Sequence, residues 1–236
     1  MGFRLPDDTQ HIAIIGRNGT GKTMAGLWHL SKRSFHLRPE LIVDFKGDDH
    51  IAGINAVEIP VGTVPTEPGI YVIHPSVGDM ARDETAMPFY ETLAGCYAKR
   101  DIGIWFDEGF VLSKNKKVES MFENLLTQGR SKHIPLIVLV QRPVWVSRFV
   151  FSEASFFQLF HLQDNRDATT AQEVIPETAF ARLPDFHSSY YDVGRDQVTF
   201  LSPVPAEAEI LSVINRRLAE IERQKRRAKN SNIKFL

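Results

Sequence analysis

The sequence predicts an α/β protein built on a mainly parallel central sheet flanked by helices, and two observations carry this prediction. Short apolar runs of strand length recur along the chain, and segments with helical spacing lie between them. Such alternation is typical of a parallel sheet whose strands are joined by crossover helices. The chain has 236 residues, 43% hydrophobic and 24% charged, which is enough for one large domain with a short appendage.

The individual elements follow from this pattern. Apolar runs predict buried strands at 11–15, 41–45, 70–74, 102–106, 135–140 and 156–162. Helical spacing predicts helices at 21–33, 88–100, 116–128 and 167–174. The stretch 51–69 is rich in proline and glycine and lacks periodicity, so we expect an irregular connection there.

The C-terminal part of the chain has a different character. Two segments, 188–193 and 197–202, flank Gly-Arg-Asp and predict a hairpin added to the sheet. From 206 to 229 a single helical pattern becomes increasingly basic. We therefore expect a main domain at 1–204 and a basic helical tail at 205–236.

Composition limits the functions that this chain can have. A formal net charge of -1 gives no global reason for polyanion binding, so any nucleic-acid surface has to be local. Cys96 is the only cysteine, which excludes an intrachain disulfide and a cysteine-based metal site. No stretch resembles a signal peptide, and no run reaches the about 18 apolar residues of a membrane span. We expect a cytoplasmic protein with no membrane span of its own.

Residues 16–23 carry the clearest chemical signal. They read Gly-Arg-Asn-Gly-Thr-Gly-Lys-Thr and match G-x-x-x-x-G-K-[ST] between a predicted strand and a predicted helix. Backbone N–H groups of such a loop point at phosphates beside the positive helix N-terminus. Lys22 would reach the β- and γ-phosphates, and the Thr23 hydroxyl would bind Mg²⁺. The expected ATP and Mg²⁺ site comprises Gly16, Asn18, Gly19, Thr20, Gly21, Lys22, Thr23 and Met24.

Asp107 and Glu108 follow the predicted strand 102–106, at the edge where parallel strands converge on a ligand. Hydrolysis needs one carboxylate that positions Mg²⁺ and another that orients the attacking water. We assign Asp107 to the metal and Glu108 to the water, because adjacent acids can divide these roles. Taken without the phosphate loop, the pair would be read equally well as exposed acids that end a strand.

The segment QGRSKHIPLIVLVQRP, at 128–143, resembles the FtsK/HerA superfamily of DNA-pumping ATPases, in which Gly-Arg precedes a strand ending in Gln-Arg-Pro. The resemblance implies a P-loop NTPase of the RecA-like type, with an additional strand and a catalytic glutamate. It implies that Gln141 is a polar sensor near the γ-phosphate. It also implies that Arg130 is an arginine finger for the neighbouring subunit's nucleotide, and hence a homo-oligomeric ring, a hexamer or a pentamer. The alternative for Arg130 is a surface arginine that favours a helix dipole.

The segment LIVDFKGDD, at 41–49, is similar to the D-P-K-G-E element of the HerA branch. Phe45 stands where that element usually has proline. This departure leaves Asp44 and Lys46 open, with a strand-end ion pair or a solvated loop as the alternative. Arg142 has no assigned role.

Basic residues predict where DNA would be held. Lys114, Lys116 and Lys117 follow the acidic pair and suit a loop that faces a channel, or else a solvated loop. Arg223, Arg226 and Arg227 lie in the tail, which would bind DNA, a viral vertex protein or nothing. An apolar stripe in the tail predicts core or interface packing; it consists of Ile210, Leu211, Ile214, Leu218 and Ile221.

A minimal ATPase core with a basic tail resembles the genome-packaging ATPases of tailless, internal-membrane double-stranded DNA viruses. This resemblance implies an ATP-hydrolysing translocase that packages double-stranded DNA into a preformed capsid, at the packaging vertex of the virion and in the host cytoplasm. Two alternatives stay open. One is a HerA-like or conjugative translocase of a cell or plasmid, which would be cytoplasmic. The other is a nucleotide-gated phage morphogenesis protein, against which the intact Glu108 argues.

Overall fold

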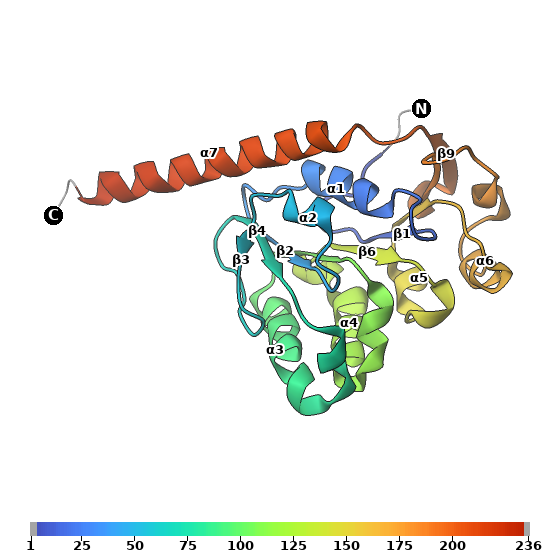
Figure 1. Cartoon of the computed structure of the whole chain (residues 1–236), viewed down its shortest axis with the longest axis horizontal. Helices are drawn as coiled ribbons and strands as arrows, with labels where there is room; N and C mark the ends of the chain where they lie inside the picture. Colours follow the sequence, from blue (N-terminus) through green and yellow to red (C-terminus); the bar gives the residue numbers. More distant parts are fainter. Residues whose placement is uncertain (1–3, 234–236) are drawn as a thin grey trace.

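The structure is a computed structural model that describes residues 4–233. Across this range the chain forms a nine-stranded sheet in the order β3-β4-β2-β5-β6-β1-β7-β8-β9 (Figure 1). All neighbours from β3 to β7 pair in parallel, and β8 and β9 are added antiparallel. The predicted α/β fold, with its mainly parallel sheet and C-terminal hairpin, is confirmed.

The strands are β1 Ile12–Ile15, β2 Pro39–Val43, β3 Val57–Glu58, β4 Gly69–Ile73, β5 Gly103–Phe106, β6 Leu136–Val140, β7 Phe156–Leu159, β8 Ser188–Asp192 and β9 Gln197–Leu201. The α-helices are α1 Lys22–Lys32, α2 Asp49–Ala52, α3 Asp83–Lys99, α4 Lys116–Gln128, α5 Phe149–Glu153, α6 Asn165–Gln172 and α7 Glu207–Ile233.

Three predicted boundaries are wrong. The stretch 51–69 is not wholly irregular, because it contains the end of α2 and the short strand β3. Helix α3 begins at Asp83 rather than at Pro88, which lies inside it. Strand β7 ends at Leu159 rather than at residue 162, because the following Phe160 packs against the phosphate loop.

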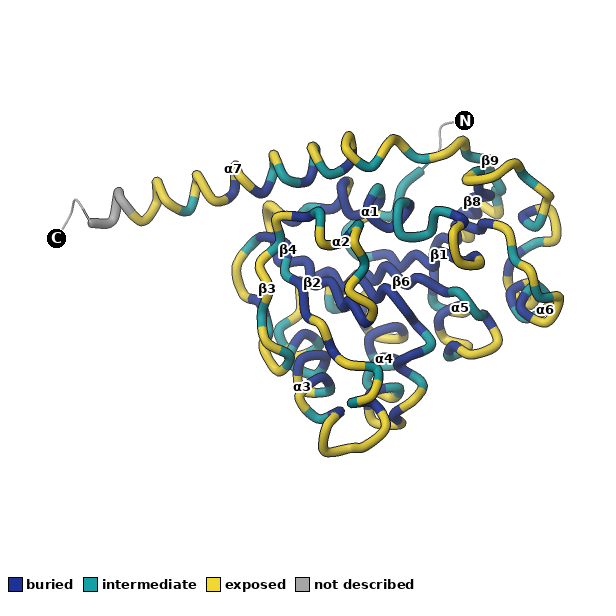
Figure 2. Tube along the Cα trace, in the orientation of Figure 1, coloured by how far each residue is buried: buried dark blue, intermediate teal, exposed yellow. Residues whose placement is uncertain are grey.

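Helices cover both faces of the sheet. Helices α3, α4 and α5 bury their apolar side chains on one face, and α1 and α7 bury theirs on the other. Alternate residues of β1 therefore belong to different layers: Ala13 and Ile15 face α4, whereas Ile12 and Ile14 face α1. Figure 2 shows the resulting unbroken run of buried residues along the central strands, as expected for strands covered on both faces.

The long helix α7 lies along α1 and then projects beyond the body of the molecule (Figure 1). The predicted apolar stripe forms its inner face, where Ile210, Ile214, Leu218 and Ile221 are buried and Leu211 is partly buried. After Ile221 the described side chains are mostly exposed (Figure 2). The division into a domain at 1–204 and a tail at 205–236 stays a prediction. The first half of the predicted tail packs on the core of the domain.

From the sequence, the tryptophans Trp28, Trp105 and Trp145 and the lone Cys96 are expected in the core, and the structure treats them differently. Trp105 and Cys96 are buried, as predicted, and burial raises the pKa of the Cys96 thiol to about 12. Trp28 is partly buried. The prediction that Trp145 belongs to the core is wrong, because its side chain is 53% exposed and lies under the Arg142 guanidinium.

Candidate nucleotide site

The phosphate loop joins β1 to α1 as the motif predicts. Gly21 precedes the first residue of α1 with a φ of 101°, a left-handed conformation that glycine adopts without strain. Because glycine has no side chain, no side chain at the N-cap accepts a hydrogen bond from the first backbone N–H groups of α1. A β-carbon at Gly16 would lie 2.7 Å from the Phe160 Cβ. The end of β7 therefore requires glycine at this position.

Lys22 and Thr23 both have hydrogen-bond partners within the protein. The Lys22 Nζ donates to the Arg17 carbonyl at 2.9 Å, across the mouth of the loop. Burial lowers the pKa of Lys22 to about 8, and the nearby Glu108 carboxylate opposes this shift. The Thr23 hydroxyl donates to the Asp48 Oδ2 at 3.3 Å. Each of these hydrogen bonds occupies a group that the motif assigns to phosphate or Mg²⁺.

The two predicted carboxylates lie directly after β5 and are buried. Asp107 is 5% exposed and Glu108 2% exposed. Burial raises the pKa of Asp107 to about 7, and its Oδ2 has no hydrogen-bond partner among the described residues. Glu108 forms an ion pair with the Lys46 ammonium. The site therefore holds one carboxylate that is paired and one with an orphaned oxygen.

The loop after β2 supplies residues whose role the sequence left open. The Asp44 carboxylate is buried and accepts the backbone N–H groups of Lys46, Gly47 and Asp48. It therefore fixes the loop that carries Lys46 to Glu108 and Asp48 to Thr23. The prediction missed Asp48, although it belongs to the quoted segment 41–49.

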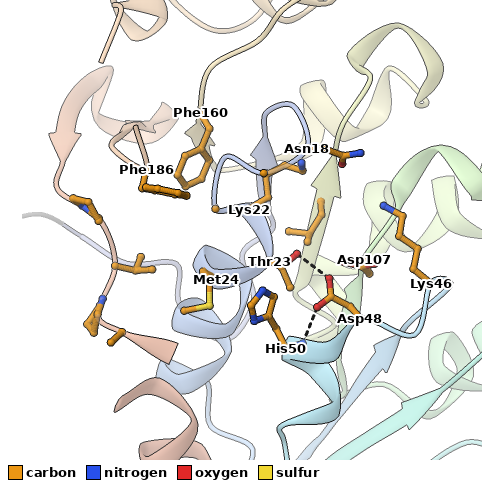
Figure 3. Close-up of a pocket in the computed structure, with 17 residues that line it drawn as sticks. Asn18, Lys22, Thr23, Met24, Lys46, Asp48, His50, Asp107, Phe160 and Phe186 are labelled. Atoms are coloured by element: carbon orange, nitrogen blue, oxygen red, sulfur yellow. Dashed lines mark hydrogen bonds between the residues drawn. The ribbon is translucent and has the colours of Figure 1, made fainter. Parts of the chain in front are cut away.

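A cavity of about 730 Å³ opens beside the phosphate loop (Figure 3). Polar groups line one end; they come from Asn18, Lys22, Thr23, Lys46, Asp48, His50 and Asp107. Apolar groups line the remainder; they come from Met24, Leu139, Phe160, Phe186 and residues 203–206. Met24 was expected here, but the aromatic pair and 203–206 were not, because they lie more than a hundred residues from the motif.

Magnesium suits the polar end of this cavity. Within the described residues no three histidine, cysteine or acidic side chains gather to form a closed metal cage. Mg²⁺ does not need one, since it is usually held by one or two carboxylates together with substrate phosphates and water. The orphaned Asp107 Oδ2 is a free oxygen ligand in this place, and the Thr23 hydroxyl lines the same cavity. The residues present therefore fit the ion.

Gln141 and Arg142 follow β6 and line a separate hollow with Arg17, on the other side of the phosphate loop. The Gly16 N–H donates to the carbonyl of Val140, so Gln141 lies next to the loop in space. The Arg142 guanidinium binds the carboxylates of Asp164 and Asp167, at 2.9 and 2.8 Å. Arg142 therefore anchors α6, which gives the unassigned residue a structural role.

Arg130 lies near the amino ends of the parallel strands, whereas the phosphate loop lies at their carboxyl ends. Arg130 follows α4, whose Leu126 carbonyl is bound by His11 just before β1 begins, whereas the phosphate loop follows the end of β1. Its side chain is exposed. Arg130 is therefore not brought together with Lys22, Asp107 and Glu108 within one subunit.

The candidate DNA-binding residues fall into two separate groups. Lys114, Lys116 and Lys117 are exposed on the side of α3 and α4; Lys117 pairs with Asp83 at 2.9 Å, and Lys114 lies over the Phe110 ring. Arg223, Arg226 and Arg227 are exposed on α7, which packs on the other face of the sheet. The structure does not join the two groups into one surface.

A parallel sheet with a glycine-rich phosphate loop and two acids at its carboxyl edge defines the class: a P-loop NTPase of the RecA-like type. The chain is 39% identical over 223 residues to the DNA packaging ATPase P9 of Enterobacteria phage PRD1, covering 90% of this chain and 95% of that protein. The chain therefore belongs to the family of this packaging ATPase. The resemblance that the sequence predicted is confirmed. No family model matches the chain.

Solved structures show the same fold. The genome packaging NTPase B204 of Sulfolobus turreted icosahedral virus 2, in complex with ATP-gammaS, matches with a TM-score of 0.67 at 15% identity. That match covers 85% of this chain and 100% of B204. The pCW3 conjugation coupling protein TcpA matches with a TM-score of 0.53 at 15% identity, covering 87% of this chain and 65% of TcpA. At these identities the matches establish the fold alone.

Proposed function

We propose that this chain is the ATP-hydrolysing motor that drives viral double-stranded DNA into a preformed capsid. The observation that carries the proposal is a complete phosphate loop near two buried acids, Asp107 in the cavity lining and Glu108 paired with Lys46, in a member of the packaging ATPase family. The conjugative and morphogenetic alternatives lack such support, because the similarity to a coupling protein extends only to the fold.

The site residues divide the work of hydrolysis. Backbone N–H groups at the start of α1 and the Lys22 ammonium bind the phosphates, and the bond from Lys22 to the Arg17 carbonyl opens for this. Thr23 and Asp107 would hold Mg²⁺, which would supply positive charge beside the phosphates. Glu108 orients the attacking water and accepts its proton. Lys46 pairs with this buried carboxylate before a nucleotide binds, so its charge is not buried alone.

Two roles belong to the assembly. Gln141, beside the phosphate loop, is proposed as the sensor of the γ-phosphate. Arg130 is proposed as the finger that enters the neighbouring subunit's nucleotide site. It lies at the opposite end of the strands from the nucleotide site of its own subunit. Such an arginine raises turnover by roughly 10³–10⁵-fold. We propose a closed ring of five or six copies.

DNA and capsid contacts complete the proposal. Exposed cations at Lys114 and Lys116 and on α7 would neutralise DNA phosphates without reading sequence. The projecting end of α7 is also available to a capsid vertex protein (Figure 1). No helix among the described residues has the length and apolar character needed to cross a membrane. We propose that the chain works at the packaging vertex of the virion and in the host cytoplasm.

Steady-state ATPase activity with and without double-stranded DNA tests this function. We expect DNA to raise turnover. Lys22→Ala should lose nucleotide binding, whereas Glu108→Gln should bind ATP with near wild-type affinity and fail to hydrolyse it. Wild-type turnover in Glu108→Gln would remove this residue from the role of base. A turnover that DNA leaves unchanged would favour the nucleotide-gated assembly protein.

A further inference from the structure

The apolar end of the cavity is not used by the phosphate chemistry described above. Phe160 and Phe186 lie together on one side of the phosphate loop (Figure 3). A β-carbon at Gly21 would lie 3.4 Å from the Phe186 Cδ1 and 3.6 Å from the Phe160 Cε1. Both rings are therefore within van der Waals reach of the glycine that begins α1.

Phe186 occupies an unusual backbone position for an aromatic residue. It is the third residue of a turn closed by a hydrogen bond from the His187 N–H to the Pro184 carbonyl, at 3.1 Å. Its φ is 62°, in the left-handed region that such turns reserve for glycine or asparagine. Its side chain is also 56% exposed. Neither backbone preference nor burial favours phenylalanine here, so the position of the ring at the cavity needs another explanation.

The connection between β9 and α7 also lines the cavity. Residues 203–206, Pro-Val-Pro-Ala, have no hydrogen-bonding group in their side chains. A hydrogen bond of 2.8 Å between the His50 Nδ1 and the Glu207 Oε1 joins the end of this connection to α2. The cavity thus continues from the phosphate loop into a slot with aromatic rings and an apolar segment in its lining.

We propose that the exposed Phe186 ring stacks on the base of the bound nucleoside triphosphate, and that the buried Phe160 and residues 203–206 complete an aromatic clamp around it. The proposal rests on the proposed function, since the phosphates of the same molecule occupy the polar end. The volume of about 730 Å³ lies within the range of about 300–1,000 Å³ typical of small-molecule sites. Aromatic and apolar side chains contact the faces of a base. The clamp therefore prefers large purine rings.

Calorimetric binding of two probes in the presence of Mg²⁺ tests the clamp. One probe is AMPPCP, which carries a base, and the other is inorganic tripolyphosphate, which does not. Phe186→Ala should weaken AMPPCP binding by between about fivefold and a hundredfold, the usual effect of losing one stacked ring. It should leave tripolyphosphate binding unchanged, and Phe186→Trp should retain both affinities.

Controls separate the clamp from folding and from the phosphate site. Phe186→Gly removes the ring while accepting the left-handed backbone, so it should repeat the effect of Phe186→Ala. Phe200→Ala removes an equally exposed ring (56%) that does not line the cavity, and it should change neither affinity. Unchanged AMPPCP binding in Phe186→Ala and Phe186→Gly would overturn the clamp. So would equal losses for both probes. If the wild-type protein bound neither probe, the proposed nucleotide site itself would fail.

Discussion

Among the described residues, two sets of buried ionisable side chains bear most directly on function and stability: those at the carboxyl edge of the sheet and the histidines of the core. At the edge, Asp107 and Glu108 meet Lys22 and Lys46, so the cost of burying charge is offset by opposite charge that a nucleotide can rearrange. In the core, His11 is buried as a neutral ring. Its Nε2–H donates to the Leu126 carbonyl, and its Nδ1 accepts the Leu136 N–H.

The buried histidines predict a loss of stability in mild acid. Burial lowers the pKa of His11 to about 4 and that of His29 to about 3. The unfolded chain binds these protons from about pH 6.5 downward and the folded chain does not, so the two histidines destabilise the fold as the pH drops below 6.5. Asp107, whose pKa is raised in the folded chain, contributes in the opposite direction over this range. At pH 5 the loss should be about 2 kcal/mol for each histidine.

Urea unfolding at pH 7.5 and pH 5 measures this effect. His29→Gln, which keeps an amide donor near Gln158, should be destabilised between pH 7.5 and pH 5 by about 2 kcal/mol less than the wild type. His133→Asn removes an exposed histidine whose left-handed backbone asparagine tolerates, and it should behave like the wild type. An equal pH dependence in His29→Gln would show that this ring takes up its proton in the folded state.

The sequence allowed the residues of the phosphate site to be predicted because their signals are local. The phosphate loop is a continuous motif between a strand and a helix, and Asp107 and Glu108 directly follow an apolar run. Phe186 and residues 203–206 could not be found in this way. The hairpin of β8 and β9 was predicted from its turn, but these residues reach the cavity because β8 pairs with β7, a long-range contact with no local signature. Trp145 was wrongly placed in the core because the sequence does not show whether a tryptophan is buried or lies at the surface against an arginine, here Arg142.

At the scale of the elements, helix α7 packs on the core with its first half and exposes basic side chains on its second half. Its first half completes the core through Ile214 and Leu218, and Arg217 donates to the carbonyls of Ser31 and Arg33. Its second half extends beyond the body with Arg223, Arg226 and Arg227 exposed, whereas Lys225 donates to the Pro68 carbonyl at 2.9 Å (Figure 2). Folding therefore depends on the first half, and the second half can be changed without opening the core.

We predict that the projecting half of α7 binds DNA through phosphates alone. Replacing Arg223, Arg226 and Arg227 together with glutamine keeps a good helix former at each position. It should weaken double-stranded DNA binding and reduce the slope of log affinity against log salt by up to about 0.9 for each DNA phosphate that the variant no longer neutralises. Deletion of 222–236 should have at least the same effect.

Fluorescence anisotropy with labelled duplexes across a salt series measures this slope. Arg216→Gln, a change on the same helix within the packed half, serves as the matched control and should leave the slope unchanged. A wild-type slope in the triple variant would show that this part of α7 contacts protein or solvent.

At the scale of the whole molecule, Arg130 lies at the amino ends of the parallel strands and the phosphate loop lies at their carboxyl ends. A head-to-tail ring can place the Arg130 edge of one subunit against the nucleotide edge of the next. Arg130→Ala should therefore leave nucleotide affinity of the isolated subunit intact while lowering turnover of the assembly by orders of magnitude.

Mixing experiments test this arrangement. Arg130→Ala and Glu108→Gln subunits are each expected to be inactive alone. Mixed rings should regain turnover, because an intact Glu108 site can then lie beside an intact Arg130. A finger acting in trans is ruled out if mixed rings form and stay inactive, or if dilute monomer hydrolyses ATP at the full rate.

The central claim is that ATP hydrolysis at this site drives DNA into the capsid, and DNA uptake by empty capsids tests it most directly. The measurement is the amount of double-stranded DNA that becomes resistant to nuclease when capsids of the virus, the chain and ATP are combined. The wild-type chain should protect DNA, and Glu108→Gln, which still binds nucleotide, should protect none. Protection by Glu108→Gln equal to that of the wild type, or protection without ATP, would contradict the account.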